Sequence, residues 1–122
     1  DMFKPGQQMA HIEQVKWADL IILCPATANT INRLASGVAD DLVGALFLAN
    51  NFNRPYLIFP AMNSEMLAHP ATERSIKSLS EWGCRILPTD DGLLACGDTG
   101  KGRLITPEKI VEIIRQELSE LP

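Results

Sequence analysis

The most reactive side chains of this sequence gather in one glycine-rich stretch, residues 95–104, which reads Ala-Cys-Gly-Asp-Thr-Gly-Lys-Gly-Arg-Leu. A thiol, Cys96, lies within a few positions of two cations, Lys101 and Arg103. The glycines disfavour a packed helix or a central strand, because glycine loses more conformational freedom on folding than other residues. The stretch therefore predicts a mobile loop that folds over a ligand and brings the thiol to it. On these residues alone an exposed turn is the more frequent explanation, since Gly-Asp-Thr-Gly is ordinary turn chemistry.

Strands and helices are expected to alternate along the rest of the chain. Short apolar runs that end at proline are typical of parallel strands buried on both faces, and they occur at residues 20–24, 56–59 and, more weakly, 84–87. Helical spacing or a helix-start signal occurs at residues 28–39, 41–49, 70–82 and from Thr106 onward, where Ile110, Val111, Ile114 and Leu118 give one apolar face. This alternation predicts an α/β fold of three layers, an open parallel sheet with helices on both faces, in one flavodoxin-like or Rossmann-like domain over residues 1–122.

In such sheets, ligands bind beyond the carboxyl ends of the strands. The segments that follow the first two predicted strands are residues 25–30 and 60–66. Each begins with proline, continues with small residues that let a ligand approach the backbone, and contains an asparagine. Plainer roles are at least as probable for each residue taken alone: helix capping for Thr27, Asn29 and Asn63, core packing for Met62 and Met66, and a surface position for His11.

Composition excludes several classes of protein. The chain has 122 residues, 46% hydrophobic and 21% charged, which indicates a globular domain. A net charge of −4 without a Lys/Arg cluster argues against nucleic-acid binding, and no apolar run is long enough to span a membrane. The three cysteines have unrelated spacings, which argues against zinc, other metals and disulfides and favours the cytoplasm. Cys24 and Cys84 lie in predicted strands and are expected to be small buried hydrophobes.

Four motifs in order resemble the phosphopantothenoylcysteine decarboxylases of coenzyme A biosynthesis, within the homo-oligomeric flavin-containing cysteine decarboxylases. The first is His11-Ile12 followed by Trp17-Ala18-Asp19, similar to the family's active-site histidine segment. Residues 25–30 differ from the family's Pro-Ala-Ser-Ala-Asn-Thr only at Thr27, which keeps the hydroxyl. Residues 60–66 fit Pro-x-Met-Asn-x-x-Met, with Leu67 where the family usually has an aromatic residue. Residues 95–104 fit the substrate clamp Ala-Cys-Gly-Asp-x-Gly-x-Gly-Arg-Met, with Leu104 in place of methionine.

The resemblance implies a flavin mononucleotide (FMN) cofactor and 4'-phosphopantothenoylcysteine as substrate. In this family the flavin oxidises the cysteine thiol to a thioaldehyde, carbon dioxide leaves, and the enethiolate is reduced again. By the same resemblance His11 is the acid/base and orienting group, Cys96 delivers the last proton, and Asn63 holds the substrate carboxylate or amide. The residues implied to contact the flavin are Thr27, Ala28, Asn29, Thr30, Ala61 and Met66, and those implied to line the substrate are Leu93, Ala95 and Leu104. Charge alone suggests that Lys101 and Arg103 screen the substrate phosphate.

The resemblance also bears on assembly and extent. The family implies a homo-oligomer, a trimer or an assembly of trimers, with no nucleic acid or membrane partner. Its domain begins with a further strand and a Gly/Ser-rich turn that helps bind the flavin, and residues 1–8 do not match these. We therefore expect the chain to correspond to about the carboxyl-terminal two-thirds of that domain. Whether a phosphopantothenate–cysteine ligase domain follows is open.

Two other functions fit parts of the pattern. A peptidyl-cysteine decarboxylase of the same superfamily would share His11 and the two proline-led segments, but it would be expected to lack the Ala-Cys-Gly-Asp clamp. A non-catalytic regulatory flavoprotein subunit would keep the fold, but it would be expected to lose His11, Asn63 or Cys96. The sequence contains all of these features, which favours the first interpretation.

Overall fold

The structure, a computed structural model, describes residues 19–50, 54–93 and 99–121. The elements in chain order are β1 (Ile21–Ala26), α2 (Ala28–Ala35), α3 (Leu42–Ala49), β2 (Tyr56–Pro60), α4 (Ser64–Ala68), α5 (Pro70–Glu81), β3 (Arg85–Ile86), β4 (Asp90–Leu93), β5 (Thr99–Arg103) and α6 (Pro107–Ser119).

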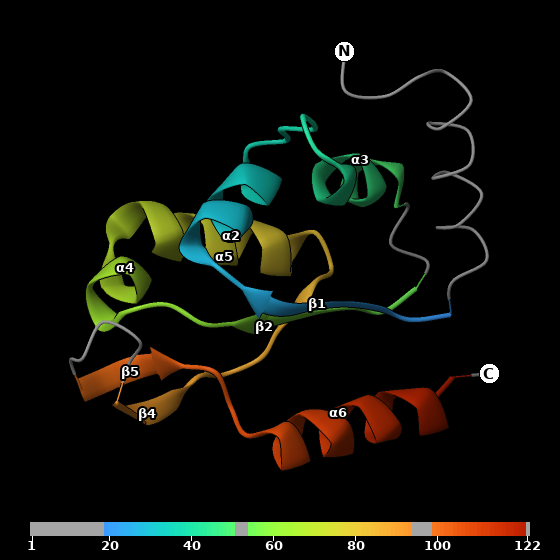
Figure 1. Cartoon of the computed structure of the whole chain (residues 1–122). Coiled ribbons are helices and arrows are strands. Elements are labelled where there is room, and N and C mark those ends of the chain that lie inside the picture. Colours follow the sequence, from blue (N-terminus) through green and yellow to red (C-terminus); the bar gives the residue numbers. More distant parts are fainter. Residues whose placement is uncertain (1–18, 51–53, 94–98, 122) are drawn as a thin grey trace.

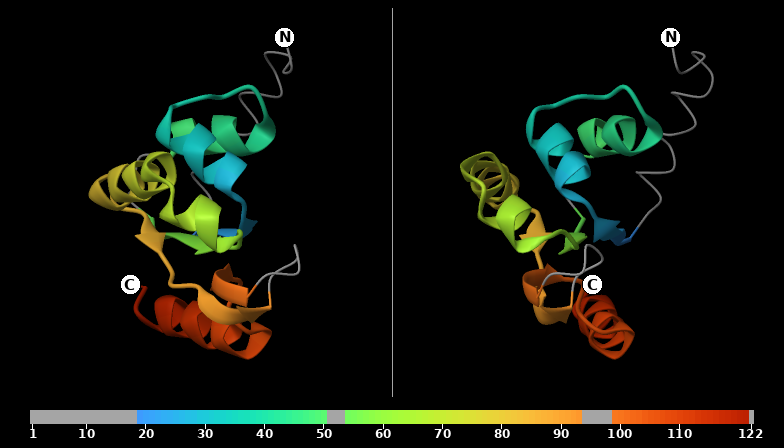
Figure 2. Two further views of the ribbon diagram at one scale, coloured as in Figure 1. Left: turned by 90° about the vertical axis from the view of Figure 1, so that its left-hand side faces the viewer. Right: turned by 60° about the vertical axis from the view of Figure 1, so that its left-hand side comes forward.

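The strands β1, β2 and β3 form a parallel sheet in that order. Helices α2, α3 and α5 lie on one face of this sheet and α6 lies on the other, so the molecule has three layers (Figure 1, Figure 2). Strands β4 and β5 follow β3 and precede α6 in the sequence, and they form a separate antiparallel hairpin. The predicted α/β class, the parallel sheet and the helices on both faces are confirmed.

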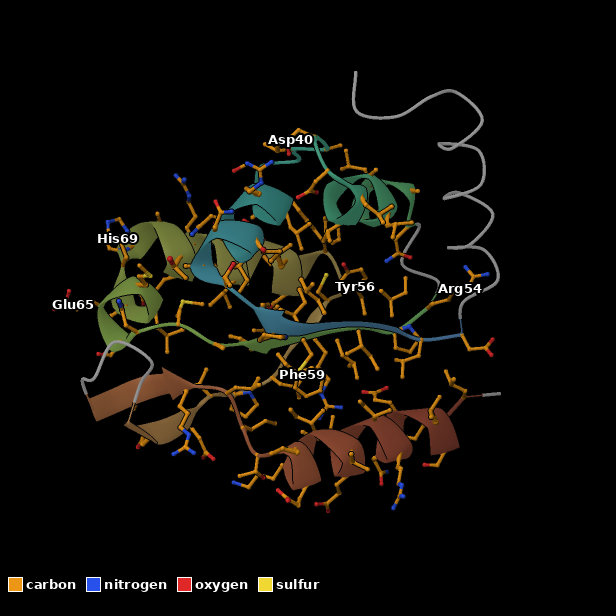
Figure 3. The ribbon with its side chains drawn as sticks, in the orientation of Figure 1. Asp40, Arg54, Tyr56, Phe59, Glu65 and His69 are labelled. Atoms are coloured by element: carbon orange, nitrogen blue, oxygen red, sulfur yellow. The ribbon has the colours of Figure 1, made fainter. Side chains whose placement is uncertain are left out.

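Two apolar clusters fill the spaces on either side of β2. Tyr56 and Ile58 pack with residues of α2, α3 and α5, whereas Leu57 and Phe59 pack with residues of α6 (Figure 3). Successive strand residues point to opposite faces, which explains how one continuous apolar run supplies both clusters. All four side chains are at most 4% exposed. Burying each of them contributes about 1.5–3 kcal/mol, so β2 anchors the edge of the sheet at which the proline-led segments emerge.

The helix-start signals are confirmed by local hydrogen bonds. Thr27 caps α2, its hydroxyl accepting a bond from the Thr30 amide at 3.2 Å. Thr106 caps α6 in the same way, accepting from the Lys109 amide at 3.3 Å. Such caps satisfy amides that have no partner within the helix, and each is worth about 1 kcal/mol. The caps therefore fix where these helices begin relative to the sheet.

Two helix predictions differ from the structure. The helix expected over residues 28–39 ends at Ala35, because Ser36 forms the cap and Gly37 adopts a φ of 71°, which breaks the helical path. On α6 the residues that pack against the core are Ile110, Ile113 and Ile114. The expected members Val111 and Leu118 are instead 46% and 48% exposed.

The expected burial of Cys24 is also wrong, whereas that of Cys84 is confirmed. Cys84 is 5% exposed and belongs to the cluster beneath α5. Cys24 is exposed, and so is Ile22, which points to the same face of β1. Strand β1 is at one end of the three-stranded sheet. The residues of α6 that pack on this face contact Leu57 and Phe59 of the middle strand, so they leave this part of β1 uncovered.

The loop expected over residues 95–104 is wrong for its second half, because Thr99–Arg103 form strand β5. Their backbone pairs with β4 from Leu93 opposite Thr99 to Asp90 opposite Arg103, with an irregularity near Asp90. A two-stranded hairpin tolerates glycines that a central strand would not, since its outer edges are unpaired. Residues 95–98 lie outside the described residues. Within the described part of the chain, no helix combines the length and apolar character needed to cross a membrane.

Candidate functional site

Three segments meet at the carboxyl ends of β1 and β2. The amide of Ala61 donates to the carbonyl oxygen of Ala26 at 3.0 Å, so the segments that follow the two strands begin side by side. One residue further, the amide of Met62 donates to the carbonyl oxygen of Gly102 at 2.8 Å, which attaches the β4–β5 hairpin to the same edge. Residues 25–30, 60–66 and the described part of the glycine-rich stretch, which the sequence separates by long distances, are therefore adjacent.

The contact at Gly102 requires glycine. Its φ is +118°, a conformation that L side chains rarely adopt. A Cβ atom there would overlap the carbonyl oxygen of Met62, and the residue is buried. Gly100 is less constrained by contact, since a Cβ there would meet the Ser64 hydroxyl at 3.2 Å, but its φ is +146°. The alternating glycines thus let the hairpin backbone touch the start of α4.

The segment after β1 presents hydroxyl groups at the start of α2. The Thr27 hydroxyl accepts from the Thr30 amide and donates to the Thr30 hydroxyl at 3.1 Å. Thr27 and Asn29 are exposed, and Ala28 and Thr30 are half-buried. A helix N-terminus carries a partial positive charge, so this turn favours an anionic group of a ligand.

Asn63 caps α4, and this hydrogen bond determines which donor and acceptor sites of its side-chain amide are left for a ligand. Its Oδ1 accepts from the Met66 amide at 2.8 Å. Of the three hydrogen-bonding sites that remain, two are the Nδ2 hydrogens and one is the second lone pair of Oδ1, so Asn63 offers a ligand mainly donors. The capping interpretation and the binding interpretation are therefore compatible, because each uses a different atom of the amide.

A pocket of about 470 Å³ brings Ala28, Asn63 and Met66 together. Its other lining residues are Asn32, Glu65, His69, Ala71 and Thr72. Met66 is 49% exposed. Met62, in contrast, packs against the core. Of the two methionines, core packing therefore applies to Met62 and not to Met66, whose thioether chain is available to a ligand.

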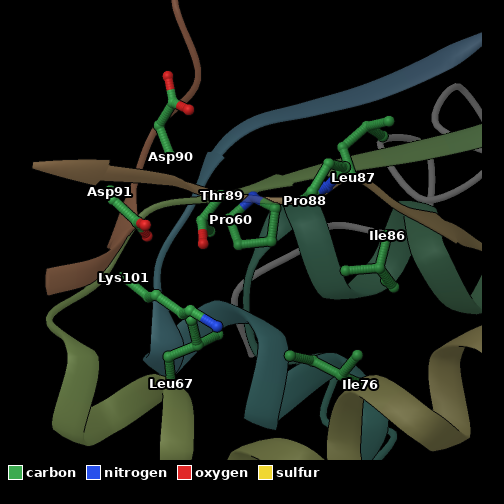
Figure 4. A pocket seen from close by; sticks show the side chains of 10 residues that line it. All are labelled: Pro60, Leu67, Ile76, Ile86, Leu87, Pro88, Thr89, Asp90, Asp91 and Lys101. Atoms are coloured by element: carbon green, nitrogen blue, oxygen red, sulfur yellow. The ribbon is translucent and has the colours of Figure 1, made fainter.

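Lys101 lines a different pocket, of about 570 Å³, at the carboxyl ends of β2 and β3 (Figure 4). Pro60, Leu67, Ile76, Ile86, Leu87 and Pro88 supply its apolar wall, and Thr89, Asp90 and Asp91 complete the lining. The Asp91 carboxylate reduces the local positive potential that Lys101 offers to a phosphate, whereas the Asp90 carboxylate pairs with Lys109 at 3.7 Å. Arg103 is exposed, and Leu104 packs against the cluster beside α6. The described residues predicted to bind substrate therefore do not share one pocket: Asn63 and Lys101 line different pockets, and Arg103 and Leu104 line neither.

Several predicted residues lie outside the described residues: His11, Ala95, Cys96 and the side chain of Leu93. Their roles stay predictions. The two cysteines that the structure describes, Cys24 and Cys84, have no predicted catalytic role. Burial raises the pKa of the Cys84 thiol to about 11, and partial burial also raises that of Cys24. Among the described residues, no group of three or more His, Cys, Asp or Glu side chains is placed to hold a metal ion.

Sequence reasoning did not identify Asn32, Glu65, His69, Ala71 and Thr72 as lining residues. A signal was present for Asn32, which follows Ala28 by four positions and so lies on the same face of α2. A signal was also present for His69, which precedes a proline at a helix start and caps α5 by accepting from the Ala71 amide at 3.0 Å. Ala71 and Thr72 line the pocket only because α5 packs beside α2, and a local sequence pattern does not predict which helices pack together.

An open parallel sheet with polar, small-residue turns at its carboxyl edge defines the class of α/β domains that bind a ligand at that edge. The chain belongs to the Flavoprotein family, which matches residues 3–119. This assignment agrees with the resemblance drawn from the four motifs.

Three known proteins show how far the similarity extends. The coenzyme A biosynthesis bifunctional protein CoaBC of Bacillus subtilis (strain 168) is 46% identical over 92% of this chain and 27% of its own length. A cysteine/cysteine sulfinic acid decarboxylase from an unidentified prokaryote is 41% identical over 100% of this chain and 35% of its own length. A solved phosphopantothenoylcysteine decarboxylase, a cysteine-to-serine mutant complexed with pantothenoylaminoethenethiol, superposes with a TM-score of 0.87 at 35% identity, covering 91% of this chain and 61% of that one. The chain spans about a third or less of the two relatives and under two thirds of the solved protein.

Proposed function

We propose that the protein containing this chain decarboxylates 4'-phosphopantothenoylcysteine to 4'-phosphopantetheine and carbon dioxide in coenzyme A biosynthesis, with FMN as cofactor. The observation that supports this most is the pair of backbone bonds at the carboxyl edge, from Ala61 to Ala26 and from Met62 to Gly102. They join the two proline-led segments to the hairpin of the clamp motif. Those motifs are the ones that resemble the decarboxylases, and they meet where α/β sheets bind ligands.

The described residues fit a flavin. Ala28 and Ala61 are small and half-buried, so a flat ring has room against the backbone, and Met66 offers an exposed apolar side chain. Thr27, Asn29 and Thr30 offer hydroxyl and amide groups at a helix N-terminus, which suits the polar side of the cofactor. When bound, FMN would supply the reversible two-electron oxidation of the substrate thiol that makes loss of carbon dioxide feasible.

The protein's own groups would then orient the substrate and move protons. Asn63 would donate from Nδ2 to the substrate carboxylate or amide. His11 would exchange protons near the carboxylate and thiol, and Cys96 would protonate the decarboxylated enethiolate as it is reduced. The ligand named for the solved serine mutant, pantothenoylaminoethenethiol, is a decarboxylated product that still lacks two hydrogens. A cysteine substitution and an unreduced enethiol thus occur together in that protein, which is what loss of a cysteine proton donor predicts.

The relative that decarboxylates cysteine or cysteine sulfinic acid favours a second candidate substrate. Its identity of 41% is close to the 46% of the bifunctional protein, so overall identity does not discriminate between them. Cysteine and cysteine sulfinic acid carry no phosphate, so their binding would not require a cation at the position of Lys101 or Arg103. The positions of Lys101, in a pocket shared with Asp90 and Asp91, and of exposed Arg103 therefore do not separate the two candidates by themselves.

A substrate comparison on the full-length, FMN-loaded protein tests the proposal. Carbon dioxide release and product mass would be followed with 4'-phosphopantothenoylcysteine, cysteine, cysteine sulfinate and a peptide ending in cysteine. Preference for the first substrate is expected, and preference for any other would replace the proposed activity. His11→Asn serves as the matched inactive variant, because it keeps a polar side chain but cannot exchange a proton near neutral pH. It should retain the yellow flavin and lose turnover, whereas normal turnover would return His11 to a surface role.

We also propose a homo-oligomer, a trimer or an assembly of trimers, in the cytoplasm. Helix α3 is apolar around most of its circumference, and two of its leucines, Leu42 and Leu48, are 44% and 55% exposed. These exposed leucines make α3 a surface that we propose for contact with another protomer. Light scattering of the full-length protein is expected to give a mass that is a multiple of three protomers, and a Leu48→Lys variant should lower it.

A further inference from the structure

A small polar network links α2 to α5 beside the pocket that contains Asn63. The Nδ2 group of Asn32 donates to the Ala28 carbonyl oxygen at 2.8 Å and to the Thr72 hydroxyl at 3.3 Å. Its Oδ1 accepts from the Ser75 hydroxyl at 2.7 Å. Thr72 and Ser75 are 2% and 6% exposed. Both amide hydrogens and one carbonyl lone pair of Asn32 are thereby used.

This network occupies an interface that is otherwise apolar. Ile31 and Leu34 of α2 and Leu79 of α5 belong to the same buried cluster and are at most 2% exposed. An apolar side chain at position 32 would favour the helix more and need no partners, since asparagine has low helix propensity. A satisfied buried network, in contrast, selects one relative position of the helices it joins, because any shift leaves polar groups without partners.

The network acts on the two segments that the proposed function uses. The Ala28 carbonyl belongs to the first residue of α2, in the turn proposed to contact FMN. Helix α5 begins directly after α4, and His69 is the cap of both, so a helix held at Thr72 also limits the position of Asn63 on α4. Asn32 and Thr72 line the same pocket as Asn63 and Ala28.

We propose that Asn32 is a positioning residue: through Ala28, Thr72 and Ser75 it fixes the distance between the flavin-contacting turn of α2 and the Asn63 cap of α4. This inference rests on the proposed binding of FMN. It assigns Asn32 no contact with the reacting atoms. Its consequence is that loss of the network should weaken FMN binding and alter the environment of the bound flavin, beyond any loss of stability.

The test compares variants of the full-length protein. Asn32→Leu removes all three bonds, Ser75→Ala removes the 2.7 Å bond alone, and Ser80→Ala, an exposed serine of the same helix, is the control. FMN dissociation constants from flavin fluorescence, thermal unfolding of the apoprotein, and visible circular dichroism at saturating FMN would be measured. We expect FMN affinity to fall about tenfold in Asn32→Leu and about threefold in Ser75→Ala, and the circular dichroism of bound flavin to change in both. Ser80→Ala should match the natural protein.

The outcomes separate this inference from the proposed function. If the natural protein binds no FMN, both are wrong. If it binds FMN and the two network variants are less stable but bind FMN with unchanged affinity and spectrum, the network is only structural and the positioning role is overturned. If Asn32→Leu does not fold, Ser75→Ala decides the question in the same way, since a single lost bond to a neutral group typically lowers stability by a modest amount.

Discussion

Replacing Gly102 by alanine tests the geometry of the site most directly. At a φ of +118° an alanine is strained by about 1–3 kcal/mol. Its Cβ would overlap the Met62 carbonyl oxygen, so the hairpin must also move and lose the 2.8 Å bond from the Met62 amide, which adds about 0.5–1.5 kcal/mol. Together these losses predict a decrease of about 1.5–4.5 kcal/mol in the free energy of unfolding, a large share of the stability of a typical domain.

Gly37→Ala is the matched control. Gly37 also has a positive φ, +71°, but nothing lies within 4 Å of the position of its Cβ. The alanine there should lower the free energy of unfolding by only about 1–2 kcal/mol, the cost of the left-handed conformation. Urea unfolding of both full-length variants would measure this difference, and hydrogen exchange of the peptide containing Met62 would report whether the hairpin detaches. Equal stability losses with unchanged exchange at Met62 would refute the close-approach argument.

Three further predictions concern single side chains. Asn63→Asp should keep the cap of α4, since aspartate is as good a cap. It should raise KM for the substrate at least tenfold, because a carboxylate at position 63 would repel the substrate carboxylate. Steady-state kinetics of the FMN-loaded protein would measure this change. Burial raises the pKa of the Cys84 thiol to about 11 from an ordinary value of 9.0, so between these values the thiol ionises in the unfolded chain but not in the folded one. The free energy of unfolding should therefore fall as pH rises from about 9 toward 11, and it should fall less steeply in Cys84→Ala. Cys96→Ser should release carbon dioxide but accumulate a product two hydrogens lighter than the saturated thiol, by mass spectrometry, because a hydroxyl is a far weaker acid than a thiol; release of the saturated thiol at the natural rate would exclude Cys96 as proton donor.

The parallel sheet, and therefore the carboxyl edge that carries the candidate site, were predictable because local signals and the core pattern agree. The run at 56–59 is buried on both faces, as a continuous apolar strand requires, and Thr27 and Thr106 start the helices they were expected to start. The shape of the site was less predictable. The sequence indicates that Gly102 does not suit a central strand, but the contact that requires glycine there involves Met62, forty positions away.

Other differences have the same origin in tertiary context. The exposure of Cys24 depends on which part of the sheet α6 covers, and a strand pattern does not contain this information. The face that α6 buries differs from the expected one by the inclusion of Ile113 and the exposure of Val111 and Leu118. The apolar stripe is broad, and Val111 and Leu118, seven positions apart, lie together at one edge of it, so periodicity alone does not select which edge meets the core.

The capping bonds also determine the character of the groups at the carboxyl edge. Because Asn63 uses Oδ1 for its cap, the amide presents Nδ2 hydrogens to the pocket. The Thr27 and Thr30 hydroxyls bond to each other, which uses one of their two hydrogens and leaves the other for a further acceptor. Glu65, the acidic side chain that lines this pocket, is exposed to solvent, which weakens its repulsion of an anion. The described edge is therefore rich in donors at a helix N-terminus, and this donor character suits a ligand that carries carboxylate and phosphate groups, as the proposed substrate and cofactor both do.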